Sequence, residues 1–226
     1  MCMGHTHALS GLVTGAAAGL YVLHLPPAGT ITLAGLTAGA AVLPDIDHPD
    51  ATLAHCFGFL TKAFAWLAGK IAGGHRWGTH SVLGVGVFTA LAWAAVYFRA
   101  DPGGRAGLLV LLSLIIAGGL YALRIGGHWA DAVAVTAAIA MTVTGTGLGL
   151  VAVATGLGCA THVFGDGLTD EGVPLAYPLS RRRVKWLPEP LAFTTGTRPE
   201  GLFALVLSLG LGWLAYHAVT LPGALT

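Results

Sequence analysis

The chain has 226 residues, of which 55% are hydrophobic and 9% are charged, and its formal net charge is +1. Soluble globular domains carry about 25% charged residues, so this composition argues against an ordinary soluble domain and favours a membrane protein with several hydrophobic segments. The near-zero net charge also argues against a nucleic-acid partner attracted by bulk charge.

Apolar runs follow one another along the chain. They cover Ala8–Leu25, Thr30–Leu43, Ser81–Phe98, Ala106–Leu123, Ala132–Thr144, Thr146–Thr161 and Gly201–Leu221. Several are shorter than the roughly 20 residues that a helix needs to cross a bilayer. We therefore predict an all-α, polytopic helical membrane protein with about seven hydrophobic segments in a single membrane-embedded domain, residues 1–226.

The first two runs are separated by Pro26-Pro27, which breaks a helix, so they are expected to form a helical hairpin. Glycines recur every four residues in the first run, at Gly11, Gly15 and Gly19. Small residues at this spacing let helices in a membrane approach closely. The pattern predicts tight packing within the chain, with a homodimer interface as the alternative.

Two polar segments interrupt the apolar runs. In residues 52–72 apolar side chains recur every three or four positions while Lys62 and Lys70 intervene, which predicts an interfacial amphipathic helix. Residues 165–200 form a predicted polar basic loop that contains Arg181-Arg182-Arg183. This loop is expected to anchor the chain at anionic lipid, with recruitment of a phosphorylated lipid head group as the alternative.

Residues 131–162 either cross the membrane once or form a short hairpin. We favour the hairpin because Thr144-Gly145-Thr146-Gly147 supplies turn residues midway, and the end of the segment then returns to the side of Asp45. With this topology most basic residues lie on the side of Asp45, and only Arg99 and Arg105 lie on the other. The positive-inside rule then places the Asp45 side at the cytoplasmic face.

Carboxylates and an imidazole lie close together where the second apolar run ends. They are Asp45, Asp47, His48 and Asp50 in the segment Leu43–Asp50. Carboxylate oxygens combined with an imidazole nitrogen suit Zn, Mn or Fe better than Ca. We interpret Asp45, Asp47 and His48 as half of a metal site, with a solvated turn favoured by Pro44 and Pro49 as the alternative.

Two candidate ligand pairs lie near the ends of the first and sixth apolar runs. His5 and His7 precede the first run, and in an extended chain both imidazoles face the same way, although a frayed terminus is an equal alternative. His162 and Asp166 are four residues apart, so on a helix their side chains share one face and can bind one metal ion. An unpaired carboxylate at membrane depth is costly, so Asp166 needs a partner.

The segment before the third run adds two imidazoles around an arginine. His75 and His80 are candidate metal ligands. Arg76 is expected to hold an anionic oxygen of the substrate, or alternatively to snorkel to the membrane interface. Thr79 and Ser81 are expected to contact substrate or to hydrogen-bond to the ligands, with helix capping as the alternative.

Taken in order, these motifs resemble the YdjM-like family, a bacterial and archaeal inner-membrane group described as metal-dependent hydrolases. The resemblance rests on His5-Thr6-His7, on Leu43–Pro49, on His75–Ser81 and on His162–Thr169, and it covers about the first hundred residues and the His162 region. It implies a distant similarity to zinc-dependent phospholipase C and P1-type nucleases, whose clustered zinc ions are held by His and Asp. Phosphoester hydrolysis is implied by this analogy alone.

We therefore predict a membrane-bound metal-dependent hydrolase that cleaves a phosphoester of a lipid or of a membrane-associated small molecule. The predicted metal ligands are Asp45, Asp47, His80, His162 and Asp166, with His5, His7, His48 and His75 as further candidates. A divalent ion, Zn with Mn or Fe as alternatives, lowers the pKa of bound water. Asp47 is the expected general base, and Arg76 is expected to stabilise developing negative charge.

Two other functions fit the same residues. A divalent-metal transporter also uses His-x-x-x-Asp pairs in helices, but its sites usually lie near the bilayer midplane, whereas these candidate ligands lie at the ends of apolar runs. A non-catalytic membrane protein whose metal only staples helices together would have a complete protein coordination shell, with no open position for water.

Overall fold

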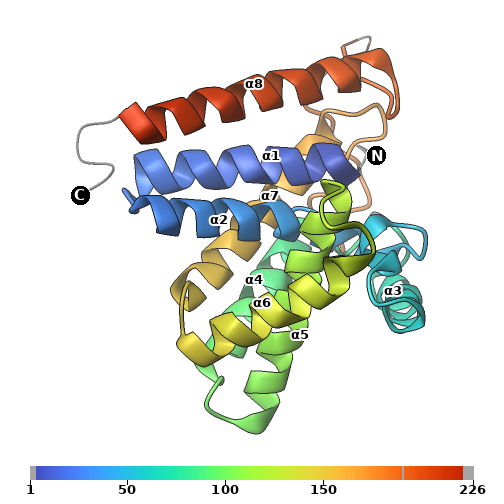
Figure 1. Cartoon of the computed structure of the whole chain (residues 1–226). Helices are drawn as coiled ribbons and strands as arrows, with labels where there is room; N and C mark the ends of the chain where they lie inside the picture. Colours follow the sequence, from blue (N-terminus) through green and yellow to red (C-terminus); the bar gives the residue numbers. More distant parts are fainter. Residues whose placement is uncertain (1–3, 190, 221–226) are drawn as a thin grey trace.

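The computed structural model describes residues 4–189 and 191–220, and these residues are mostly helical (Figure 1). The α-helices are α1 (Gly4–Ala17), α2 (Pro27–Ala40), α3 (Phe59–Ile71), α4 (Val82–Tyr97), α5 (Pro102–Ala122), α6 (Ala130–Thr144), α7 (Val151–Gly167) and α8 (Arg198–Thr220). Short helical turns extend or join them: η1 (Ala18–Val22), η2 (Leu43–Asp47), η3 (Thr52–His55), η4 (Gly127–Trp129) and η5 (Leu148–Leu150). The predicted all-α fold is confirmed.

Two groups of helices make up the fold. Helices α1 and α2 lie side by side with α8 along the outer side of α1, while α4, α5 and α6 form a second group that runs away from them (Figure 1). Helix α7 joins the two groups, because it packs against α1, α2 and α4. The main hydrophobic core consists largely of small and aliphatic side chains of α2, α5, α6 and α7. Helix α7 is therefore held on several sides.

Glycine allows α2 to pack closely against both of its neighbours. A Cβ atom added to Gly11 of α1 would lie 2.5 Å from the carbonyl oxygen of Thr37 in α2. On the other side of α2, a Cβ atom added to Gly39 would overlap the backbone of Ile115 in α5. The predicted α1–α2 hairpin and the predicted tight packing within the chain are confirmed here, while a homodimer stays a prediction.

Four helical segments among the described residues are long and apolar enough to cross a membrane. They are Pro27–Asp47, Pro102–Ala122, Leu148–Gly167 and Arg198–Ala218, and α4 is a shorter apolar helix. The end of the seventh predicted run, Leu221, lies outside the described residues. The predicted class of helical membrane protein is confirmed, whereas the predicted number of about seven segments is not.

The amphipathic helix predicted over residues 52–72 forms as α3 only from Phe59, because the segment is broken between η3 and α3. At the break Phe57 and Gly58 have positive φ angles of 44° and 62°. Partners outside the helix satisfy the freed backbone groups: the Phe57 amide donates to Asp131 Oδ2 of α6 at 3.2 Å, and the Thr61 hydroxyl donates to the Ala54 carbonyl at 3.0 Å. These contacts tie the break to α6 and to η3.

The polar loop is shorter than predicted, since α7 continues to Gly167 and α8 starts at Arg198. Trp186 folds the loop back onto α7 by donating from Nε1 to the Phe164 carbonyl at 2.9 Å. At the other end the buried Glu200 accepts a hydrogen bond from Thr6 of α1 at 2.8 Å. The loop and the start of α8 are thus tied to the ends of α7 and α1.

The turn between α6 and α7 reverses the chain. Gly145 and Gly147 have φ angles of 75° and 71°, which glycine adopts without steric cost. Helix α7 then runs back to the end of α2, where His162 Nδ1 lies 2.7 Å from the Ala41 carbonyl oxygen. The hairpin favoured by the sequence is confirmed as a reversal of the chain, and its position in a membrane stays a prediction.

A matched pair of glycines on α2 tests the close helix contact. Gly39→Ala forces α2 and α5 apart and should lower the free energy of unfolding by about 1–3 kcal/mol, the usual cost of overpacking. Gly35→Ala, one helical turn earlier, meets no atom within 4 Å and should leave stability nearly unchanged. Thermal denaturation of both variants in detergent measures the difference. Equal stability of the two variants would contradict the packing argument.

Candidate metal centre

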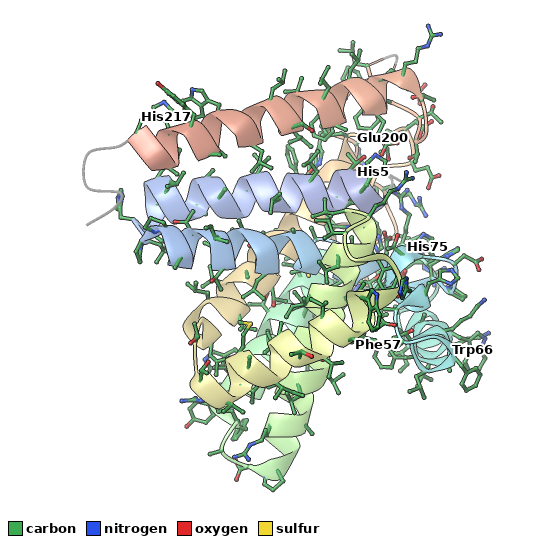
Figure 2. The ribbon with its side chains drawn as sticks, viewed as in Figure 1. His5, Phe57, Trp66, His75, Glu200 and His217 are labelled. Atoms are coloured by element: carbon green, nitrogen blue, oxygen red, sulfur yellow. The ribbon has the colours of Figure 1, made fainter. Side chains whose placement is uncertain are left out.

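Four segments meet at one end of the molecule. They are the start of α1, the turn η2 after α2, the loop before α4, and the end of α7. Figure 2 shows His5 at this end of α1 and His75 near it, whereas His217 lies at the far end of α8. The predicted site residues that are buried here are His7, Asp45, Asp47, Arg76, Thr79, His80, Ser81, His162 and Asp166. Motifs far apart in the sequence therefore converge.

The middle of the cluster is formed by Asp45, His80 and His162. The Nε2 atoms of His80 and His162 lie 3.0 Å apart, and Asp45 Oδ1 lies 3.4 Å from the first and 3.6 Å from the second. Asp45 Oδ1 is buried and has no hydrogen-bond partner among the described residues. These three atoms are close enough to hold one metal ion, and they are of the types that Zn prefers.

The outer nitrogens of both imidazoles face acceptors. His162 Nδ1 must carry a proton, because the Ala41 carbonyl oxygen 2.7 Å away can only accept. The Thr79 hydroxyl donates to Asp47 Oδ2 at 2.5 Å, so its oxygen accepts from His80 Nδ1 at 2.9 Å. In the neutral imidazoles both Nε2 atoms then carry lone pairs, which face each other beside a carboxylate. This arrangement calls for a cation between them, and a metal ion satisfies both nitrogens at once.

A second group adjoins the first and shares His162 with it. His7 Nε2 lies 3.2 Å from Asp166 Oδ1, and the His7 ring stacks on the His162 ring at 3.7 Å between centroids. Asp166 Oδ2 lies 3.5 Å from His80 Nε2 and 3.7 Å from His162 Nε2. The ligand atoms of His7, His162 and Asp166 are also close enough to hold a metal ion. Because His162 has only Nε2 left to offer, it can bind an ion in one group at a time.

Arg76 balances the buried charge of Asp166. Its Nη2 lies 2.5 Å from Asp166 Oδ2, its Nη1 lies 2.5 Å from Glu171 Oε2, and its side chain is 2% exposed. Burial by itself lowers the pKa of the guanidinium, but the negative charges of Asp166 and Glu171 outweigh burial and raise this pKa above its ordinary value. Arg76 is therefore a charged internal partner for Asp166. The alternative that it snorkels to the interface is wrong, and its contact with substrate stays a prediction.

Asp47 holds the loop before α4 in place. Its Oδ1 lies 2.7 Å from His75 Nδ1, and its Oδ2 accepts from the Arg76 amide at 3.0 Å and from the Thr79 hydroxyl. The predicted roles of Asp47 as metal ligand and general base remain untested, but both of its oxygens are already hydrogen-bonded. These contacts indicate that Asp47 is a positioning residue, because it holds Thr79 and Thr79 in turn orients His80.

The remaining predicted site residues lie around the cluster. Helix α1 starts at Gly4, so the extended conformation expected for His5 and His7 is wrong, and on a helix residues two apart point to different faces. His48 Nδ1 accepts from the Asp50 amide at 3.1 Å, and the His48 ring packs against His75. Ser81 caps α4 by accepting from the Gly84 amide at 3.1 Å, as its structural alternative predicted.

Two partners of the cluster are not evident from the sequence. Glu171 is half-exposed, and its carboxylate lies against both Arg76 and Arg183, at 2.5 Å and 3.8 Å. The Ala41 carbonyl sets the tautomer of His162, and a backbone acceptor has no residue-type signal at all. Both contacts link segments more than 90 residues apart. Only tertiary structure could reveal them.

A comparison with protein families agrees with this geometry. The family model described as YdjM inner membrane protein matches residues 1–221. The chain belongs to the YdjM family. No curated protein and no solved structure matches it. Membership of an inner-membrane family, together with the apolar helices, fits a membrane location for this YdjM-family chain.

Replacement of His162 tests whether this YdjM-family chain binds metal. His162→Ala removes the ligand common to both groups, and loss of even an outer-shell partner typically weakens metal binding by about 10–100-fold. We expect Zn per purified chain, measured by mass spectrometry of the elements, to fall by at least that factor. His128→Ala is the control, because His128 is exposed and far along the chain from these motifs. Equal Zn content in the two variants would remove His162 from the site.

Replacement of Arg76 tests the internal ion pair. Arg76→Met leaves Asp166 buried without its guanidinium partner, which should destabilise the fold by about 3–5 kcal/mol. Arg183→Gln removes a longer contact with the half-exposed Glu171 and a surface contact with the Trp77 ring, and it should change stability by less than about 1 kcal/mol. Denaturation midpoints of both variants in one detergent provide the measurement. A stable Arg76→Met protein would show that Asp166 is balanced by another group.

Proposed function

We propose that this protein is a membrane-bound metal-dependent hydrolase that cleaves a phosphoester of a lipid or a membrane-associated molecule. The observation that carries the proposal is the pair of facing Nε2 atoms of His80 and His162 beside the unpartnered Oδ1 of Asp45. Donor atoms arranged in this way favour a divalent cation such as Zn. When bound, such an ion acts as a Lewis acid and lowers the pKa of coordinated water.

The balance of buried charge supports the same residues as ligands. Arg76 offsets Asp166, while Asp47 accepts hydrogen bonds from three partners in the loop before α4. Among the described residues, the ion-pair neighbours of Asp45 are the imidazoles of His80 and His162, which are neutral in the tautomers assigned above. A carboxylate buried in this way needs a cation to compensate its lost solvation. Asp45, His80 and His162 are therefore the proposed ligands, and His7 and Asp166 are the adjoining ones.

Other side chains of the chain would serve the reaction indirectly. Thr79 holds His80 in the tautomer that presents Nε2, and Asp47 in turn orients Thr79. His75 is 26% exposed and hydrogen-bonded to Asp47, so it is the histidine best placed to exchange a proton with solvent. The proposed roles of these residues are positioning for Asp47 and Thr79, and proton transfer for His75.

The cytoplasmic face is the proposed location of the site. Arg183 reaches the cluster through Glu171 and Arg76, so the basic loop lies on the side of the site. Arg99 and Arg105 lie at the turn between α4 and α5. Basic residues gather at the cytoplasmic ends of membrane helices, and the larger number on the side of the site supports this orientation.

A non-catalytic metal staple is the second candidate function, and one observation favours it. Asp45, His80 and His162 are each at most 4% exposed, so the middle of the cluster is nearly closed to water. Structural zinc sites have a complete set of protein ligands, whereas catalytic sites keep one position open. A divalent-metal transporter is less well supported, since the ligands lie at helix ends instead of midway along helices.

Metal-dependent release of phosphate or head groups tests the hydrolase. The purified protein is stripped with chelator, mixed with a native lipid extract, and given Zn, Mn or Mg. Release should return with one metal, and Asp45→Ala should lower it by about a hundredfold or more, given the 10–100-fold cost of losing an outer-shell partner alone. Asp50→Ala, an exposed carboxylate of the same segment, should retain full release.

The outcomes separate the candidate functions. Full turnover by Asp45→Ala would remove Asp45 from the reaction. No release with any of the three metals, together with one tightly held ion whose removal lowers the melting temperature, would refute the hydrolase and support the staple. Uptake of metal into sealed vesicles would support the transporter.

A further inference from the structure

An apolar groove runs between α3 and α4 and ends beside the candidate metal centre. It encloses about 560 Å³. Its walls are made mainly by the exposed side chains Phe64, Leu67 and Ile71 of α3 and Leu83, Val87 and Leu91 of α4. Between Leu83 and Leu91 the groove follows α4 for about 12 Å at the helical rise of about 1.5 Å per residue. This length suits a stretch of extended hydrocarbon chain.

One end of the groove is polar and touches the cluster. Thr79 lines the groove, and its hydroxyl group contacts both Asp47 and His80. Ile46, which also lines the groove, lies between the two aspartates of η2. Tyr177 lines the groove at this end. The loop that carries it is tied to the start of α4, because the Val82 amide donates to the Leu175 carbonyl at 3.1 Å. A molecule in the groove would thus have one end next to the metal centre.

Positive charge gathers at the same end. The ring of Tyr177 lies 5.6 Å from the ring of Trp77. The guanidinium groups of Arg181 and Arg183 lie over the Trp77 ring, at 5.6 Å and 5.3 Å from its centroid. Glu171 is an acidic group at this rim, and it lies 2.5 Å from Arg76 and 3.8 Å from Arg183. The rim therefore presents cations held by an aromatic ring, which suits an anionic head group.

We propose that the α3–α4 groove binds one acyl chain of an anionic phospholipid, with the head group at Arg181 and Arg183 beside the metal centre. The apolar walls match the chain, the cationic rim matches the phosphate, and Thr79 connects the site to His80. The assignment rests on the proposed function in one respect, namely that the bound lipid is the substrate. Lipid binding itself requires only the groove and the rim.

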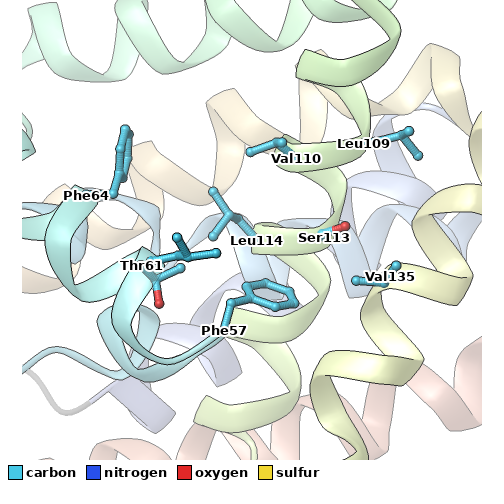
Figure 3. Close-up of a pocket in the computed structure, with 9 residues that line it drawn as sticks. Phe57, Thr61, Phe64, Leu109, Val110, Ser113, Leu114 and Val135 are labelled. Carbon is cyan, nitrogen blue, oxygen red and sulfur yellow. The ribbon is translucent and has the colours of Figure 1, made fainter.

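A second groove on the protein provides an internal control. It encloses about 400 Å³ between α3, α5 and α6 and is lined by apolar residues that include Phe57, Phe64, Val110 and Val135 (Figure 3). Among the residues that the structure describes, its lining includes no member of the metal cluster and no arginine. Any membrane lipid can fill such a surface groove without specificity. A specific site must therefore differ from this groove in head-group preference.

Photo-crosslinking of the full chain in nanodiscs tests the proposal. The probe is phosphatidylglycerol with a diazirine in one acyl chain, diluted in phosphatidylcholine, and the comparison probe is phosphatidylcholine with the same diazirine. The protein is kept in chelator so that no turnover occurs. We expect adducts on peptides of α3 and α4, with at least about fivefold higher yield for the anionic probe.

One pair of single variants locates the acyl chain, and one double variant locates the head group. Val87→Trp fills the α3–α4 groove and should lower the adduct yield by about tenfold, because burial of a few methylene groups is lost. Val110→Trp makes the same change in the control groove and should leave the yield unchanged. Arg181→Gln combined with Arg183→Gln should abolish the preference for the anionic probe and leave folding intact, since both side chains are at the surface.

Several outcomes would overturn the proposal. Equal labelling of the two grooves, or equal losses in Val87→Trp and Val110→Trp, would mean ordinary surface lipid. Absence of adducts on α3 and α4, with a Val87→Trp protein of lower oligomeric mass, would mean that a second copy covers the groove. Because labelling needs no metal, labelling of the chelated protein combined with no release in the separate assay with added Zn, Mn or Mg would refute the hydrolase and leave the lipid site standing.

Discussion

The burial of several carboxylates at one end of a poorly charged protein is the constraint on which this structure depends. A carboxylate removed from water is costly unless a cation or several donors replace the lost solvation. Asp166 has Arg76, and Asp47 has His75, Thr79 and the Arg76 amide. Among the described residues, Asp45 forms no ion pair with arginine or lysine and lies beside the imidazoles of His80 and His162, which is why its surroundings point to a metal ion. The conformation of the loop before α4 is fixed by these contacts of His75, Arg76 and Thr79 with the two aspartates.

The fold delivers these groups from distant parts of the chain by close helix packing. Gly11 and Gly39 let α2 lie against α1 and α5 with little space between the backbones. The end of α2 is then close enough to α7 for the Ala41 carbonyl to reach His162. Side chains on four segments can thus be placed within hydrogen-bonding distance, although at least one whole helix separates each segment from the next in sequence.

The same end of the molecule joins three environments. The metal cluster is buried, the α3–α4 groove is apolar, and the rim at Trp77 carries exposed arginines. Thr79 belongs to both the cluster and the groove wall, and Arg76 links the cluster to Glu171 and from there to Arg183. An anionic phospholipid has matching parts, with an acyl chain that suits the groove and a negatively charged phosphate that suits the arginine rim and the metal centre. This match is the physical basis for the proposed lipid substrate.

The sequence by itself determined the class of the protein and the identity of its polar clusters. Low charge and apolar runs require helices in a membrane, because only internal hydrogen bonds satisfy the backbone there. Pro26-Pro27 and Gly145 mark where those helices turn, and Asp45, His80 and His162 stand out as polar residues in apolar surroundings. These features are local, so the order of residues is enough to find them.

Only the tertiary structure decided what each polar residue does. It showed that Asp45 lies beside His80 whereas Asp47 contacts His75. It also showed that His7 and Arg76 both contact Asp166. It further showed that the helix predicted over residues 52–72 is interrupted near Phe57, where Asp131 of α6 accepts a hydrogen bond from the Phe57 amide. The physical reason is the same in each case. The protonation and partner of a buried group depend on acceptors and donors from other segments, and those become neighbours only when the helices pack.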